Sequence, residues 1–262
     1  MYSLSFFKNF GANEPYEINK MVINNLITIT NRMNIPTKFI EDTPVVYNFN
    51  KISFVQNITT KILTDNEKNE IKIKSFLNKI TNENIDDMAS NIFQIMSTDT
   101  FCLIFDICSK NKFFSNIQSK LIVKLCENVE FKEYVFERLE NVKVLFDDIQ
   151  YSEDDYINNK KLDDRESMTC LYANLYLQHF ILKESFESFG SYLIAKIEDF
   201  IDAENKKSEL EELLNMIYLI LSMTSLNIDK SIIEKISKST NKTFKSVTNK
   251  SIFKCMDIME LN

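Results

Sequence analysis

The amino-acid sequence predicts an all-α protein, and two observations lead to that fold class. The chain of 262 residues contains only 2 glycines and 3 prolines, and its apolar residues recur at helical spacing. All the prolines lie at or before Pro44, and Gly190 is the only glycine beyond that point. Turns between β-strands rely on glycine and proline. A long stretch nearly free of both residues is therefore typical of helices joined by short polar connections.

We expect an N-terminal arm at residues 1–50 and a helical domain at residues 51–262. The arm holds the prolines, and its apolar spacing predicts one amphipathic helix over Tyr16–Met33. Pro36 and Pro44 then interrupt the helical pattern. The domain boundary therefore follows the change from a proline-containing to a proline-free sequence.

The domain is predicted to be a series of helices with polar N-caps. Side-chain caps are expected at Asp65, Thr81, Ser115 and Asp229. The predicted helices cover residues 52–62, 65–80, 81–96, 99–110, 115 onward, 131–149, 167–183, 185–203, 206–225, 229 onward and 245–261. The acidic stretch Asp147–Glu166 is predicted to be a mobile loop. Short connections favour antiparallel neighbours, and about five such pairs side by side would form an α-solenoid.

The charge balance disfavours a protein whose main role is to bind nucleic acid. The net charge is −7, whereas nucleic-acid-binding domains are usually basic. Lysines nevertheless accumulate near the C-terminus, and Lys242, Lys245 and Lys250 are candidate contacts to an RNA backbone. The alternative interpretation of these lysines is an ordinary solvated helix face.

The five cysteines favour a reducing compartment because their number is odd and their spacing is scattered. The first residues lack the basic start and the long apolar stretch of a signal peptide. No window approaches the roughly 18 apolar residues of a membrane-spanning helix. We therefore expect a cytoplasmic location and no membrane contact.

The sequence lacks the arrangements of residues that enzymes usually need for catalysis. His179 is the only histidine, it has no metal ligand at suitable spacing, and the simplest interpretation is a partly exposed residue at a helix end. The two glycines cannot form a phosphate-binding loop. We expect neither catalysis nor a cofactor or metal.

Residues 75–85 resemble the opening of the middle domain of translation initiation factor 4G. The pattern of that family is Leu-Asn-Lys-Leu-Thr, then three variable residues and an aromatic or apolar residue. The identical residues are Leu77, Asn78, Lys79 and Thr81, and similar apolar residues stand at Ile80 and Ile85.

Three further blocks resemble the same family in the same order. They are Ile104–Ser115, Leu171–Ile181 and Phe253–Leu261, so that the resemblance covers about residues 67–262. Two departures stand out, because Lys112 replaces the usual proline and Ala173 replaces a glycine. The alternative is that these blocks are core positions of any helical repeat.

The resemblance implies a HEAT-repeat scaffold for translation initiation that binds a DEAD-box helicase of the factor 4A type and holds its two lobes. The helicase-binding residues that it implies are Leu77, Asn78, Lys79, Ile80, Thr81, Ile85, Phe114, Phe180 and Ile181. Leu77 and Ile80 either contact the helicase or hold the turn that does, and Asn78 and Thr81 are expected to brace that turn.

The arm contains a second candidate motif. Tyr16, Met21 and Val22 resemble the Tyr-x-x-x-x-Leu-Φ motif by which this family binds cap-binding factor 4E. These three side chains would share one face of a helix, which suits insertion into a groove. The alternative is a helix that packs on the protein's own domain.

Two other functions stay open at this point. One is a helical adaptor that binds a host signalling protein, and the other is a related HEAT scaffold in mRNA processing or decay. Binding to a DEAD-box helicase would separate the first of these from an initiation scaffold.

Overall fold

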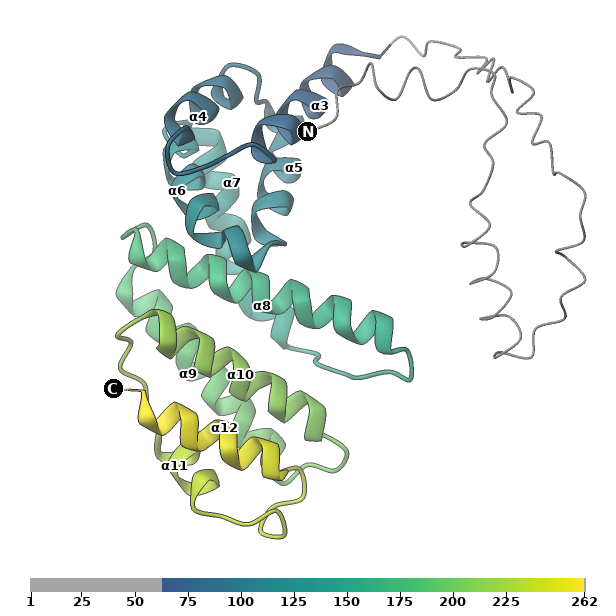
Figure 1. Cartoon of the computed structure of the whole chain (residues 1–262), viewed down its shortest axis with the longest axis vertical. Helices are drawn as coiled ribbons and strands as arrows, with labels where there is room; N and C mark the ends of the chain where they lie inside the picture. The colour runs from purple at the N-terminus through teal and green to yellow at the C-terminus, as the bar shows by residue number, and fades with distance from the viewer. Residues whose placement is uncertain (1–62, 262) are drawn as a thin grey trace, which may run out of the picture. The chain divides into compact units, whose positions relative to one another are not determined.

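The computed structural model describes residues 63–261, and all regular structure in that range is helical (Figure 1). It contains ten α-helices and two short 3-10 helices, with no strand among the described residues. The all-α prediction is therefore confirmed for this range. The predicted helices at Tyr16–Met33 and at residues 52–62 lie outside the described residues, as does the whole arm.

The α-helices follow one another with short connections. They are α3 (Asp65–Leu77), α4 (Ile85–Phe93), α5 (Thr98–Ser109), α6 (Ser115–Leu125), α7 (Val129–Glu140), α8 (Asp155–Leu177), α9 (Lys183–Ile201), α10 (Lys207–Met223), α11 (Ser231–Ser237) and α12 (Asn249–Glu260). The 3-10 helices are η1 (Lys112–Phe114) and η2 (Val142–Phe146).

Polar side chains cap several helices, but the capping residue is often one position away from the predicted one. Thr64, and not Asp65, caps α3, because its hydroxyl accepts from Glu67 N and the Glu67 carboxylate accepts from Thr64 N. Asp229 Oδ1 accepts from Ser231 N over 2.9 Å, so Asp229 does bond the first residue of α11. Ser115 is itself the first residue of α6.

The main contacts join helices that are close in sequence. Helix α3 packs on α4 and α5, and α6 packs on α4, α5 and α8. The next group is formed by α8, α9 and α10, and α12 then packs on α10 and α11 (Figure 1). One continuous core runs through these contacts, and its largest fully buried side chains include Phe131, Phe146, Phe186 and Phe189.

The prediction of a loop over Asp147–Glu166 is wrong, because helix α8 begins at Asp155. The Asp154 side chain caps this helix by accepting from Tyr156 N and Ile157 N. The charged residues at the end of the predicted loop are buried against other elements, since Arg165 pairs with Glu212 of α10 and Glu166 pairs with Lys112 of η1. Charges that look solvated in the sequence are thus satisfied by distant partners.

Two other boundaries also differ from the prediction. The helix predicted over residues 131–149 ends at Glu140, where Asn141 Nδ2 donates to the Glu137 carbonyl, and η2 follows. The helix predicted to begin at residue 167 is the second half of α8. In the part of the chain that the structure describes, no helix combines the length and apolar character needed to cross a membrane.

Candidate protein-binding surface

The segment 75–85 forms the end of α3, a turn, and the start of α4. Its apolar members Leu77, Ile80 and Ile85 are all buried in the core, with 7%, 8% and 7% of their surface exposed. These three side chains therefore hold the turn in place. The exposed members are Asn78, Lys79, Thr81, Asn82 and Glu83, and these are the ones that a partner can reach.

Asn84 stabilises this turn. Its Oδ1 accepts from Thr81 N over 2.7 Å, and its Nδ2 donates to the Lys79 carbonyl over 2.9 Å. The two bonds hold the backbone on either side of the buried Ile80. The sequence predicts that Thr81 caps the next helix, but α4 begins at Ile85, with Asn84 in the N-cap position. The bracing role predicted for Asn78 and Thr81 thus belongs to the Asn84 side chain.

Helix α6 connects three of the four blocks that resemble the initiation-factor family. Its first residue lies in the second block, and the Ser115 hydroxyl accepts from Asn174 Nδ2 of the third block over 2.9 Å. Further along α6, Lys120 Nζ donates to Asn82 Oδ1 in the first block over 3.1 Å. Five residues of helix separate these two contacts, a rise of about 7.5 Å. Blocks that are far apart in sequence are therefore close together along this helix.

The exposed surface beside α6 contains two neighbouring phenylalanines in η1. Phe113 is 86% exposed and Phe114 is 50% exposed. The Lys112 side chain fixes η1 by pairing with the carboxylates of Glu166 and Asp163. The hydrogen bond that Lys112 donates to Glu166 raises the pKa of Lys112. We name the α3–α4 turn at residues 78–84, η1 and the exposed flank of α6 the α6 edge.

Sequence reasoning selected Phe114 and missed Phe113, which is the more exposed of the two. The sequence does contain an indication that Phe113 is exposed, because two consecutive phenylalanines stand directly before the helix start predicted at Ser115. A short 3-10 segment cannot turn two adjacent side chains toward the same core.

The third block ends on a different surface. Ile181 is buried, whereas Phe180 is half-buried and stacks on Phe136 of α7 with ring centroids 4.9 Å apart and planes 7° apart. Leu182 follows and is 71% exposed. Phe180 thus packs on α7, through Phe136. Its role in helicase binding stays a prediction.

His179 lies at the end of α8 in the left-handed region, with φ 57°. It is exposed, and its backbone N–H donates to the Tyr176 carbonyl over 2.9 Å. Histidine is among the residues that tolerate this conformation better than most. Among the described residues no group of three or more His, Cys, Asp or Glu side chains could hold a metal ion.

Two of the three candidate RNA-binding lysines are paired with carboxylates. Lys245 lies 3.2 Å from Glu204, and Lys250 lies 2.8 Å from Glu211. Lys242 is exposed. The pairing reduces the positive charge that this region can offer to a phosphate backbone. The cap-binding motif at Tyr16, Met21 and Val22 lies outside the described residues.

Comparisons of the chain with protein-family models, curated proteins and solved structures find no match.

Proposed function

We propose that this chain is a helical scaffold that binds a DEAD-box RNA helicase of the factor 4A type, as the middle domain of initiation factor 4G does, and that the α6 edge is the contact surface. The observation that carries the proposal is the convergence of three resembling blocks on α6 through Ser115–Asn174 and Lys120–Asn82. The Ser115–Asn174 contact is buried between α6 and α8, whereas the Lys120–Asn82 contact lies at the surface, where a partner can reach it.

The packing supports a solenoid of the HEAT type. A solenoid is a chain of helix pairs in which each pair contacts only its neighbours. The main contacts here have that near-neighbour character. Four successive pairs are in contact, α3–α4, α5–α6, α9–α10 and α11–α12, whereas α7 packs mainly on α5 and α8 packs mainly on α6 and α10. Such an arrangement leaves a long edge free for a partner with two lobes.

The proposed mechanism is a population shift in the helicase. A scaffold that contacts both lobes in their closed arrangement stabilises that arrangement by its higher affinity for it. The α6 edge offers groups suited to one of these contacts. Lys79 supplies an exposed charge at the α3–α4 turn, and Phe113 supplies an exposed aromatic ring at η1. Phenylalanine is among the residues that are enriched in protein interfaces relative to the rest of the surface.

The test measures the RNA-dependent ATPase rate of a purified factor 4A helicase with and without this protein. We expect stimulation by the wild-type chain and its loss in the double variant Lys79→Glu/Phe113→Ser. Both side chains are exposed, so the variant should keep its fold, whereas substitutions at the buried Leu77 or Ile80 would not.

The matched control is Lys207→Glu/Phe253→Ser, which also removes one exposed lysine and one exposed phenylalanine. It should stimulate like the wild type. Absence of any binding between the wild-type chain and the helicase would disprove the proposal. Equal loss of ATPase stimulation in the two double variants would show that the α6 edge is not the contact surface.

The proposal extends to a cap-binding protein through the arm. Capture of a factor 4E protein by the full chain should disappear in Tyr16→Ala, because this side chain is the anchor of the motif. Unchanged capture by the variant would show that the motif is not used. This test is independent of the helicase measurement.

A further inference from the structure

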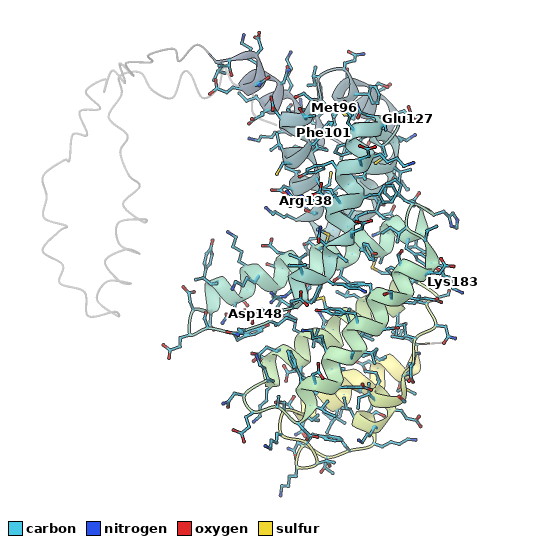
Figure 2. All side chains as sticks on the ribbon, turned by 180° about the vertical axis from the view of Figure 1, so that it is seen from behind. Met96, Phe101, Glu127, Arg138, Asp148 and Lys183 are labelled. Atoms are coloured by element: carbon cyan, nitrogen blue, oxygen red, sulfur yellow. The ribbon has the colours of Figure 1, made fainter. Side chains whose placement is uncertain are left out.

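A second surface on the same domain lies outside the α6 edge and carries apolar groups, one of which, Phe180, the family resemblance also assigns to helicase binding. Phe136 of α7 is 38% exposed and stacks on the half-buried Phe180, and Leu182 beside it is 71% exposed. Figure 2 views the side of the molecule on which Arg138 of α7 and Lys183 at the start of α9 are labelled. We name Phe136, Phe180 and Leu182 the aromatic patch.

Four glutamates line the solvent side of α7 next to this patch. They are Glu130, Glu133, Glu137 and Glu140, all of them exposed. Steps of three and four residues place them along one face of the helix. Phe136 lies within this row, three residues after Glu133 and four before Glu140, so the aromatic patch is flanked by carboxylates.

These carboxylates have no ion-pair partner within residues 63–261. Some surface acids on other helices are paired, as in Glu70–Lys74 and Glu234–Lys238, whereas all four glutamates of this row lack a pair within the described residues. The two cations of α7 contact aromatic side chains instead of these carboxylates, and one of them, Lys132, lies over the patch residue Phe136. Lys132 lies 5.9 Å from the Phe136 ring centroid, and Arg138 donates to the Tyr134 hydroxyl over 3.0 Å.

The row of glutamates is unfavourable for the helix that carries it. Glu133 and Glu137 are like charges four residues apart, which destabilises a helix. Glu140 ends α7, where the helix dipole disfavours negative charge. A local cost without a compensating contact in the folded chain is expected at a surface that serves a function.

We propose that this face binds a segment of a partner protein in which lysine or arginine residues surround one or two apolar side chains. The apolar side chains would cover the aromatic patch, and the cations would neutralise the glutamates. Charge complementarity selects this occupant, because nucleic acids and anionic membranes carry the same sign of charge as the row. The proposal uses none of the residues of the α6 edge, so it does not depend on helicase binding.

The probe is a displayed library of random 16-residue peptides selected on the full-length protein. We expect the enriched peptides to be basic and to contain an aromatic residue or leucine. Their affinity, measured by fluorescence anisotropy with synthetic copies, should fall at least tenfold in the variant Glu133→Lys/Glu137→Lys. It should also fall as salt is raised, since screening weakens contacts between exposed charges.

The matched control is Glu198→Lys/Asp202→Lys at the C-terminal end of α9, where Asp202 is the C-cap residue. It reverses two exposed acids at the same four-residue spacing and changes the net charge equally. It should bind the peptides within about twofold of the wild type, because charges beyond a Debye length are screened. A second variant, Phe136→Ser, tests the apolar part, with circular dichroism to verify its fold.

Three results would overturn the proposal. They are failure to enrich any peptide, enrichment of peptides that are not basic, and an equal loss of affinity in the α7 and α9 variants. The last result would mean that net charge alone attracts the peptides.

Discussion

The backbone N–H of Thr81 donates to the side-chain Oδ1 of Asn84 over 2.7 Å, and this bond closes the turn between α3 and α4. Asn84 also donates to the Lys79 carbonyl over 2.9 Å. The residue that fixes the turn therefore lies outside the Leu-Asn-Lys-Ile-Thr motif itself.

Replacing Asn84 should destabilise the domain, because Asn84→Ala removes both bonds. We expect a loss of about 1–3 kcal/mol in the free energy of unfolding, measured by urea denaturation. Asn84→Asp keeps the acceptor for Thr81 N and loses the donor, so its loss should be smaller. Equal stability of Asn84→Ala and wild type would show that the turn is held by Ile80 alone.

Arg165 and Glu212 form a buried ion pair between α8 and α10, in which Arg165 Nη2 donates to Glu212 Oε2 over 2.9 Å. Arg165→Met should cost about 3–5 kcal/mol of unfolding free energy, because it leaves a buried carboxylate without its cation. The double variant Arg165→Met/Glu212→Leu should recover a large part of that loss. Lys238→Met breaks the exposed pair with Glu234 and should cost no more than about 1 kcal/mol.

A single charge reversal on α7 should stabilise the protein. Glu137→Lys places a lysine four residues after Glu133 and near the C-terminal end of the helix, and both effects are favourable. We expect a gain of about 0.5–1 kcal/mol, seen as a higher thermal midpoint. Glu130→Lys is the control, because Glu130 lies in the first turn, where a lysine is unfavourable. A gain from both variants would instead indicate a general effect of net charge.

The protein should lose stability at alkaline pH. Burial raises the pKa of the Cys108, Cys126 and Cys255 thiols from 9.0 to about 12. The unfolded chain therefore releases these protons first, so the contribution of these thiols to stability is fully present below pH 9.0 and is lost as the pH rises toward about 12. The urea midpoint should follow this fall, and Cys108→Ala should make it shallower. An unchanged slope in Cys108→Ala would assign the fall to other groups, such as Tyr151, whose pKa is raised by burial and by Glu212.

The helical class and most helix positions were predictable from local patterns. The lack of glycine and proline and the apolar spacing depend only on neighbouring residues, and the helices α5 and α10 lie within two residues of their predicted bounds. Exposure within the initiation-factor motif was less predictable. Leu77 and Ile80 could have faced a partner or the core, and only the surrounding helices bury them.

The sequence by itself determined that residues 63–261 form a succession of helices, because periodicity and the absence of chain-breaking residues act locally. The tertiary structure decided which residues that are distant in the sequence lie next to each other. The charged middle of α8 is held against η1 and α10 because Glu166 contacts Lys112 and Arg165 contacts Glu212, which lie 54 and 47 residues away in the sequence. Phe136 and Phe180 become one surface only when α7 meets the α8–α9 turn. Such contacts depend on the path of the chain through space, which spacing in the sequence does not contain.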